Sequence, residues 1–486
     1  MPRREGPRKR LPLVLCYIPL TLDTQPRQSR GGRRSPSLAA FLSFLWPGLG
    51  QLYAGRRRLA AVFAVPALLV LLLVLFQLRR GVVVFAAQFV QPGFALGGLA
   101  VVAFLGVWRA LSIGHAFAVA YAPRSRAGLQ RALAIALLAV VVLSHSVAGY
   151  VLWVTYDAGS QAFAPNPDLT DAETPGPTPA PGATPGATVT QVPLPTPLVK
   201  GRVTMLFTGV DSASGRSEHL YDSIMVVSYD PKTNSAQMVS VPRDSASFPM
   251  YYGGQVNAAV RINALPTYVR NGWVRSPDDP YTTLVKEISY LVGIPINYYA
   301  VMDLAAFVKM VDLAGGIDVN NPSQINDSVY DWLGAKPVAG FSLSPGPHHL
   351  DGVDALAYVR SRHGANNNDW ARASRQQEVL VDLLLAMAQP GKLLLLPQMI
   401  STLGSSLSTN FPSDKVADYV AVAEGIPSSN FKQIVLGPPY TILGINNVSS
   451  ASTTCLINAM VATLSVQLFG QDSTWYGKKA PANTCP

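Results

Sequence analysis

The sequence predicts a layered α/β domain behind an N-terminal multi-span α-helical membrane region. Of the 486 residues, 49% are hydrophobic, and the mean hydropathy of +0.23 is too apolar for an ordinary soluble enzyme. The long stretches suited to membrane spans lie before residue 157. From residue 202 onward, short β-branched runs alternate with segments of helical periodicity, which is typical of α/β layers.

The N-terminal part carries the excess of positive charge. Residues 1–36 contain arginine clusters without sustained apolar periodicity, so we expect a basic, disordered cytoplasmic tail rather than a cleavable signal. Residues 1–157 hold about 18 Lys and Arg against about three acids, as the positive-inside rule predicts. Residues 200–390 hold about 15 basic and about 18 acidic side chains. That balance disfavours nucleic-acid binding.

Four apolar stretches make up the predicted membrane region, residues 37–157. Spanning takes about 20 apolar residues. The first stretch, 38–54, is short, is broken by "WPGLGQ" and has arginines on both sides, so we expect a re-entrant or tightly paired segment with both ends inside. The chain should then cross outward at 59–78, return near 94–121 and cross outward again at 129–156. Arg79 and Arg80 contradict the positive-inside rule in this arrangement, which leaves the number of spans open.

The segment 158–200 is rich in Pro, Thr, Gly and Ala and has almost no large apolar side chains. Such a composition cannot bury a core and predicts an extended, semi-stiff linker. The linker would hold the following domain away from the membrane, in an extracytoplasmic position.

Strands and helices are expected to alternate in the domain at 201–390. "DPKTNS" predicts a turn between two strands, Asp303 a helix N-cap, and Gly315 the end of that helix. Residues 391–486 are expected to form a helical extension packed on this domain. That extension contains Cys455 and Cys485, which either pair or remain free thiols. The expected strands are 203–210, 223–229, 235–241, 298–302 and 317–321, and the expected helices are 281–292, 304–314, 352–360 and 371–388.

Two aspartates flank the first connection between strands. Asp211 directly follows "LFTGV" and Asp222 directly precedes "SIMVV". Because strand ends converge in layered folds, both carboxylates could reach one divalent ion, and Mg²⁺ often takes one or two protein carboxylates. Paired aspartates in turns are more often simple caps, so this pair alone is a weak signal.

Arginines accumulate farther along the domain. Arg243 ends the hairpin, Arg360 and Arg362 follow a helix at a spacing of two, and Arg372, Arg375 and Gln376 fall on one helix face. Each alone could be a solvated surface charge. Guanidinium groups grip phosphate oxygens bidentately, so together with two acids for a metal they indicate a pyrophosphate clamp. The sequence contains neither a Gly-rich phosphate loop nor a Ser/His/Asp set, which disfavours an NTPase or an ordinary hydrolase.

At these residues the sequence resembles the LytR-CpsA-Psr family of cell-wall ligases. The resemblance covers about residues 202–390. It rests on the ordered segments "GVDS", "YDSIMVVSYDPKTN", "VSVPRDS", "RINA", "GIPINYYAVMDLAAFVKMVDLAGGIDV", "LDGVDALAYVRSRH" and "NDWARASRQQ".

The resemblance implies an extracytoplasmic α-β-α domain with a central mixed sheet, behind a plasma-membrane anchor in a bacterium. It implies transfer of a glycopolymer from a polyprenyl-pyrophosphate carrier to peptidoglycan, with release of polyprenyl phosphate. Asp211 and Asp222 would hold Mg²⁺ (or Mn²⁺), Asp211 would also activate the acceptor hydroxyl, and apolar residues of the sheet and helices would line a groove for the prenyl chain. The residues implied to bind the pyrophosphate are Arg243, Arg261, Arg360, Arg362, Arg372, Arg375 and Gln376, and Arg243 would also act in catalysis.

The chain departs from the family pattern in three places. Leu220 stands where the family usually has an arginine, two residues before the second metal-site aspartate, and Arg216 could substitute for it. Arg261 replaces a frequent lysine and keeps the charge. Several spans replace a single anchoring helix.

Three functions stay open at this stage. The leading hypothesis is the phosphotransferase. The same residues would serve a hydrolase that splits the lipid pyrophosphate with water, and a non-catalytic polyprenyl-phosphate-binding assembly protein would result if Leu220 had disabled the chemistry. A transporter is disfavoured because His115, Arg109 and His145, the ionisable groups of the spans, lack an obvious carboxylate partner there.

Overall fold

The computed structural model describes residues 34–120, 127–163 and 202–211, most of 219–437, and the strands 441–443 and 454–456. Several predictions fall outside these residues. They are the tail as far as residue 33, the linker from residue 164 to 201, and the roles of Arg216 and Cys485. The linker, the tail and the cysteine pairing therefore remain predictions.

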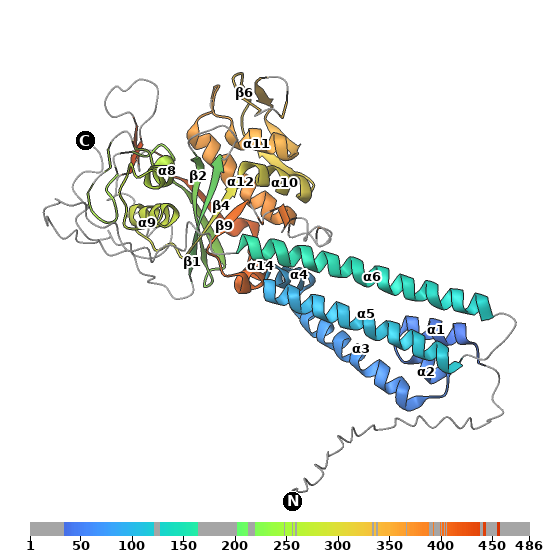
Figure 1. Ribbon diagram of the computed structural model, residues 1–486. Helices are drawn as coiled ribbons and strands as arrows, with labels where there is room; N and C mark the ends of the chain where they lie inside the picture. Colours follow the sequence, from blue (N-terminus) through green and yellow to red (C-terminus); the bar gives the residue numbers. More distant parts are fainter. Residues whose placement is uncertain are drawn as a thin grey trace, which may run out of the picture.

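Three helices among the described residues are long and apolar enough to cross a membrane. They are α3 (Arg57–Gln77), α5 (Pro92–Ala120) and α6 (Ala127–Ala162), which run side by side away from the rest of the molecule (Figure 1). Their surfaces expose large apolar side chains, including Leu69, Leu73 and Leu143, as a helix facing lipid does. The predicted multi-span region is confirmed at the level of helix length and composition.

The first apolar stretch forms a short helical pair. α1 (Pro36–Leu45) breaks at Gly48, whose φ of +100° suits glycine, and α2 (Leu49–Tyr53) turns back. Gln51 is fully buried and donates to the Ser112 carbonyl of α5 at 2.8 Å. Arg109 Nε donates to the Phe44 carbonyl at 2.9 Å, which satisfies the C-terminal end of α1. These contacts give Gln51 and Arg109 hydrogen-bond partners inside the bundle.

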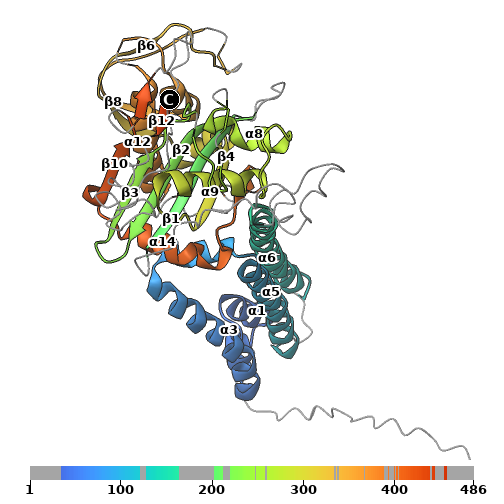
Figure 2. The same cartoon turned by 90° about the vertical axis from the view of Figure 1, so that its left-hand side faces the viewer.

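The outer end of the bundle packs against the globular domain. Between α3 and α5 the chain forms η1 (Leu78–Arg80), α4 (Val82–Ala87) and η2 (Gln88–Val90). α4 lies beside α14 (Val416–Glu424) of the domain in both views (Figures 1 and 2). Val84 and Ala87 are buried there with Ala417, and Arg80 forms an ion pair with Asp418. The positive-inside rule disfavoured Arg80 on the side of the bundle that faces the domain. The ion pair with Asp418 accounts for its position there.

The packing of α4 on α14 can be tested with two valines of the same helix. Val84 is 1% exposed, and Val82 is 55% exposed. In Val84→Asp, burial of an unpaired carboxylate should separate the two helices, because such burial costs several kcal/mol. Hydrogen exchange of residues 416–424 in nanodiscs should then be faster than in wild type, while Val82→Asp should leave it unchanged. Equal exchange in all three proteins would contradict this packing.

Six strands of the described residues form one mixed sheet, in the order β10-β3-β2-β1-β4-β9. β1 pairs in parallel with β4 and antiparallel with β2, β2 pairs antiparallel with β3, β3 parallel with β10, and β4 antiparallel with β9. The strands are β1 (Val203–Asp211), β2 (Leu220–Asp230), β3 (Ser235–Ser240), β4 (Tyr298–Asp303), β9 (Leu407–Thr409) and β10 (Phe431–Val435).

Helices cover both faces of the sheet, so the predicted layered fold with a central mixed sheet is confirmed. α8 (Leu265–Arg270) and α9 (Pro280–Val292) pack on one face through the core that contains Leu206, Val226 and Ile288 (Figure 2). On the other face Met225 and Met238 meet Val381 of α12 (Asp369–Met387). Asp303 caps α10 (Leu304–Ala314), which ends at Gly315, as expected.

A second core lies on the α12 side of the sheet, beneath two small two-stranded sheets. There α10, α11 (Gly352–Arg360) and α12 enclose Val311, Tyr358 and Val379. β5 (Ile317–Asn321) pairs with β8 (Gly346–Leu350), and β6 (Ile325–Asp327) pairs with β7 (Phe341–Leu343). This subdomain carries several of the arginines predicted to bind pyrophosphate.

The predicted helical extension 391–486 needs correction. α14 is helical, but β9 and β10 of this segment form the two edges of the central sheet. β10 pairs with β3 in register Ile434 to Val239, which β-branched residues favour. β11 (Thr441–Leu443) and β12 (Thr454–Leu456) form a further pair. The segment therefore completes the domain rather than covering it from outside.

Glu287 in α9 is a fully buried carboxyl whose environment makes stability depend on pH. Burial raises its pKa well above the ordinary value, although the Tyr251 N–H donates to it at 3.0 Å. A carboxyl with a raised pKa in the folded state stabilises the fold fully below its ordinary pKa, and this contribution is lost as the pH rises toward the raised value.

We expect Glu287→Gln to remove this pH dependence. Relative to the variant, wild type should lose up to about 1.4 kcal/mol of stability per pH unit above the ordinary glutamate pKa. Thermal unfolding at pH 5 and pH 8 measures this, and the variant's advantage in Tm should grow with pH. Asp414→Asn, at an exposed position, is the control and should show no such trend. A constant difference between wild type and Glu287→Gln would refute a raised pKa.

Candidate functional site

A β-bulge brings the two predicted metal-site aspartates to the same end of the sheet. Gly209 pairs with Ser223 and Val210 with Tyr221, so Asp222 is the extra residue of β2. Tyr221 and Ile224 both belong to the core on the α9 side, an irregular alternation that lets Asp222 face the α12 side. Asp211, the last residue of β1, is 1% exposed. Both carboxylates line one cavity.

The exit from β3 supplies Arg243, and the segment before α8 supplies Arg261. Arg243 forms an ion pair with Asp222, and its Nε lies 3.7 Å from Asp244 Oδ2. Asp244 also receives Arg261 Nη1 at 3.1 Å. The Asn263 N–H donates to the Arg243 carbonyl at 3.1 Å, so this backbone contact joins the two chain segments that carry Arg243 and Arg261.

The end of α11 supplies two more. Arg360 is the last residue of the helix, and its Nη2 lies 3.3 Å from Asp211 Oδ2. Arg362 follows in the segment 361–368 that leads to α12. Both line the cavity, as the two-residue spacing predicts.

A buried aspartate fixes the backbone of that segment. Asp327 of β6 accepts hydrogen bonds from Ser361 Oγ at 3.0 Å and from the N–H groups of Arg362 and His363 at 3.1 and 3.2 Å. Burial acts to raise the pKa of Asp327, but these hydrogen bonds outweigh it and hold the pKa below its ordinary value. Asp327 therefore stays ionised and holds Arg362 at the cavity.

Arg375 differs from its predicted role, because it does not line the cavity. Its guanidinium is 5% exposed and donates to the Tyr358 carbonyl at 2.7 Å and to Asn367 Oδ1 at 2.9 Å. Asn367 in turn donates to Ser361 Oγ at 2.7 Å. Arg375 is thus a positioning residue for segment 361–368.

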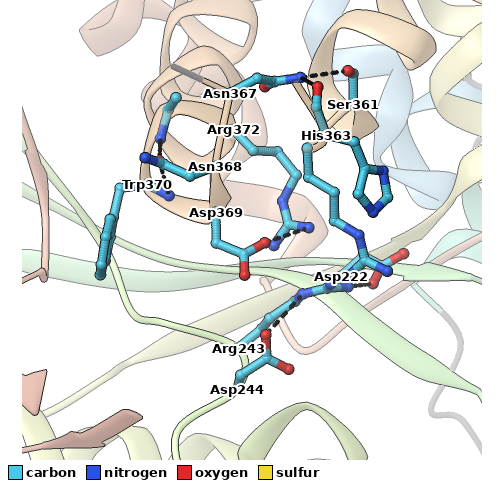
Figure 3. Close-up of polar contacts among 12 residues, drawn as sticks. Asp222, Arg243, Asp244, Ser361, His363, Asn367, Asn368, Asp369, Trp370 and Arg372 are labelled. Carbon is cyan, nitrogen blue, oxygen red and sulfur yellow. Dashed lines mark hydrogen bonds and ion pairs between the residues drawn. The ribbon is translucent and has the colours of Figure 1, made fainter. Parts of the chain in front are cut away.

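Arg372 and Gln376 reach the cavity from α12, as predicted. Arg372 Nη1 lies 3.0 Å from Asp369 Oδ1 in the first turn of the helix (Figure 3). Burial, together with the nearby Arg243 guanidinium, lowers the pKa of Arg372 to about 10. Arg372 is therefore cationic at neutral pH but held in an environment that favours a counter-anion.

The residues meet around a cavity of about 660 Å³. Five arginines and six aspartates line it, which gives a formal charge of −1 with His363 neutral. Figure 3 shows Asp222, Arg243, Asp369 and Arg372 clustered beneath the first turn of α12. Except for Arg375, every site residue predicted from the sequence lines the cavity: Asp211, Asp222, Arg243, Arg261, Arg360, Arg362, Arg372 and Gln376.

Sequence reasoning placed Asp244 beside Arg243 at the sheet edge but missed other polar residues of the cavity wall. Asp369 pairs with Arg372, and their spacing of three residues was a usable signal. Asp327 and Tyr330 come from the β6–β7 hairpin, whose position depends on tertiary packing. Leu220 also lines the cavity opposite Asp211, so the arginine usual in the family is absent there.

The two strand-end carboxylates are compatible with a magnesium ion, although no group of three acids, histidines or cysteines in the described part could hold one. Magnesium usually keeps water and phosphate oxygens in most of its coordination positions and takes one or two carboxylates. Asp211 and Asp222 each contact an arginine, so a metal would share these carboxylates with Arg360 and Arg243.

The chain matches the LytR_cpsA_psr family model over residues 183–457. It belongs to the LytR-CpsA-Psr family. The match begins before β1 and extends past β12, so it covers the site as well as the sheet.

Similar proteins include regulatory protein MsrR of Staphylococcus aureus, 31% identical over 219 residues that cover 44% of this chain and 58% of MsrR. Another is the polyisoprenyl-teichoic acid--peptidoglycan teichoic acid transferase TagU of Bacillus cereus, 25% identical over 218 residues that cover 44% of this chain and 62% of TagU. The chain thus matches less than two thirds of the length of either relative.

The solved structures that are similar include TagV of B. subtilis, with 21% identity, a TM-score of 0.43, and coverage of 56% of this chain and 98% of TagV. TagT bound to LI-WTA has 21% identity and a TM-score of 0.42, with coverage of 56% and 90%.

Variants of the two buried arginines of α12 should separate support of the site from binding in it. Arg375→Ala leaves the Tyr358 carbonyl and Asn367 without their donor, so we expect a stability loss of about 2–4 kcal/mol. Arg372→Met removes a buried charge beside Arg243 and should keep or raise the Tm, while it abolishes binding of inorganic pyrophosphate. Thermal unfolding and titration calorimetry measure the two effects. A large loss of Tm in Arg372→Met would contradict this division of roles.

Proposed function

We propose that the protein transfers a glycopolymer from a polyprenyl-pyrophosphate carrier to peptidoglycan, as a magnesium-dependent phosphotransferase. The observation that carries the proposal is the convergence of five arginines and two strand-end carboxylates on one cavity. Guanidinium groups bind phosphate oxygens in pairs and neutralise charge that builds up on a leaving phosphate. The name of the relative TagU, a teichoic acid transferase, supports the same reaction class.

In the proposed step the acceptor hydroxyl oxygen attacks the phosphorus that carries the glycan. The bond from this phosphorus to the bridging oxygen breaks, polyprenyl phosphate leaves with the bonding electrons, and a phosphodiester joins glycan and peptidoglycan. The hydroxyl proton passes to a carboxylate of the cavity. The sequence suggested Asp211, and Asp369, whose side chain is 37% exposed, is a second candidate for this role.

The charge of the cavity favours a divalent cation as partner of the substrate. A formal charge of −1 would repel a pyrophosphate, whereas one Mg²⁺ bound by Asp211 and Asp222 would change the charge to +1. The ion would supply electrostatic stabilisation of the phosphate oxygens. Arg243, Arg360, Arg362 and Arg372 would orient the pyrophosphate, and Gln376 would donate to it.

The membrane helices support a membrane-anchored protein. We propose that the α/β domain lies on the extracytoplasmic side, because the basic side chains concentrate before residue 157 and the chain crosses an odd number of times in α3, α5 and α6. A lipid-linked substrate and a cell-wall acceptor both meet the protein on that side.

The test uses the full chain in nanodiscs with a synthetic polyprenyl-pyrophosphate oligosaccharide, peptidoglycan fragments and Mg²⁺. Asp222→Ala and Arg362→Ala should each lower the rate of glycan attachment by roughly 100-fold or more, since each removes charge stabilisation at the reacting phosphate. Arg275→Ala, at an exposed position outside the cavity, should leave the rate unchanged. Mass spectrometry follows polyprenyl phosphate and the attached glycan, and chelation of the metal should stop both.

Other outcomes identify the alternatives. Release of polyprenyl phosphate without attachment would show a hydrolase. Binding without either product would show a non-catalytic carrier-binding protein, and Leu220 would then be the first residue to replace by arginine.

A further inference from the structure

A second, smaller cavity adjoins the first one. Its volume is about 250 Å³, and it lies between the first turn of α12 and the ends of β2, β3 and β10. Seven residues line both cavities, so the two meet along a shared wall. Arg243, Asp369 and Arg372 belong to that wall, and Trp370 lies on the other side of Asp369 (Figure 3). A molecule held by the arginines would therefore have the second cavity beside its phosphate.

The second cavity combines an apolar wall with a polar rim. Trp370, Val241, Pro242 and Val435 provide the apolar part. The rim contains the carboxylates of Asp222, Asp244 and Asp369 and the side-chain amides of Asn368 and Gln376. Its groups thus accept hydrogen bonds at several points around one flat aromatic surface.

The backbone of Trp370 and its indole each have a close neighbour. Asn368 Oδ1 accepts the backbone N–H groups of Trp370 and Ala371 at 3.1 and 2.9 Å, which fixes the start of α12. Gly437 lies against the indole, because a Cβ there would be 3.0 Å from Trp370 Nε1 and 3.2 Å from its Cδ1. Glycine at this position lets the chain after β10 approach the ring without displacing it.

We propose that this cavity binds one pyranose ring of a glycan, stacked on Trp370. The inference rests on the proposed function. A pyranose has an apolar C–H face, which suits an indole, and an edge of hydroxyl groups, which suits carboxylates and amides. A prenyl chain fits the cavity poorly, because hydrocarbon would leave the rim carboxylates and amides desolvated and without partners.

Two glycans could supply this ring. The second cavity lies beside the arginine-lined cavity. This position suits the first sugar of the carrier-linked donor and equally the sugar that bears the acceptor hydroxyl. Both present the same chemistry to Trp370, and the experiment separates them.

The experiment measures binding of three probes to the full chain in nanodiscs. They are polyprenyl pyrophosphate without sugar, polyprenyl-pyrophosphate disaccharide, and a soluble peptidoglycan disaccharide. Trp370→Ala should weaken at least one sugar-containing probe by about tenfold or more and leave the sugar-free probe unchanged. Trp370→Phe should keep most of the affinity. Trp273→Ala, at a 64% exposed position outside both cavities, is the matched control.

The pattern of loss identifies the source of the ring. Loss for the lipid-linked disaccharide alone indicates the donor sugar, and loss for the soluble fragment indicates the acceptor sugar. Unchanged affinity for every sugar-containing probe, or an equal loss for the sugar-free probe, overturns the inference. If wild type does not bind sugar-free polyprenyl pyrophosphate, the proposed function fails. In that case, binding of the soluble fragment that depends on Trp370 would still support a glycan site. Lack of such binding would overturn the glycan site as well.

Discussion

The arrangement of the site depends on how two buried side chains of opposite charge hold the segment between α11 and α12. Asp327 accepts three hydrogen bonds from the segment 361–363, and Arg375 donates to both of its ends through Tyr358 and Asn367. Because both side chains are desolvated, these hydrogen bonds are what make their burial tolerable. The segment in turn places Arg362 at the arginine-lined cavity and Asn368, next to Trp370 of α12, at the second cavity.

The remaining arginines illustrate a cost that the site imposes on the fold. Arg243 lies close enough to Arg372 to disfavour its charge, and burial acts in the same direction and more strongly. Aspartates offset this repulsion in the absence of substrate. A bound pyrophosphate would replace the aspartates as partners of the arginines, and the released carboxylates would then be available to a metal or to an acceptor hydroxyl.

The sequence was informative where periodicity and charge are local. The strands before Asp211 and after Asp222, the cap at Asp303 and the helix that ends at Arg360 all follow from neighbouring residues. The bulge at Asp222 and the pairing of β9 and β10 with the sheet depend on strands that are distant in the sequence. No local sequence pattern predicts them. Arg375 was misplaced for a geometric reason. It and Gln376 lie about 100° apart around a helix. Arg375 is directed to the Tyr358 carbonyl of α11, whereas Gln376, which donates to the Val359 carbonyl, also reaches the cavity.

The contact between α4 and α14 has a mechanical consequence. With Val84 and Ala87 packed on Ala417, the α/β domain meets the membrane bundle through a second, non-covalent attachment in addition to the chain that continues from Phe163. The position of the arginine-lined cavity relative to the apolar helices is then set by the packing of α4 on α14 and not by the number of residues from 164 to 200. Insertions or deletions in that stretch would leave this position unchanged, whereas a charged side chain between α4 and α14 would alter it.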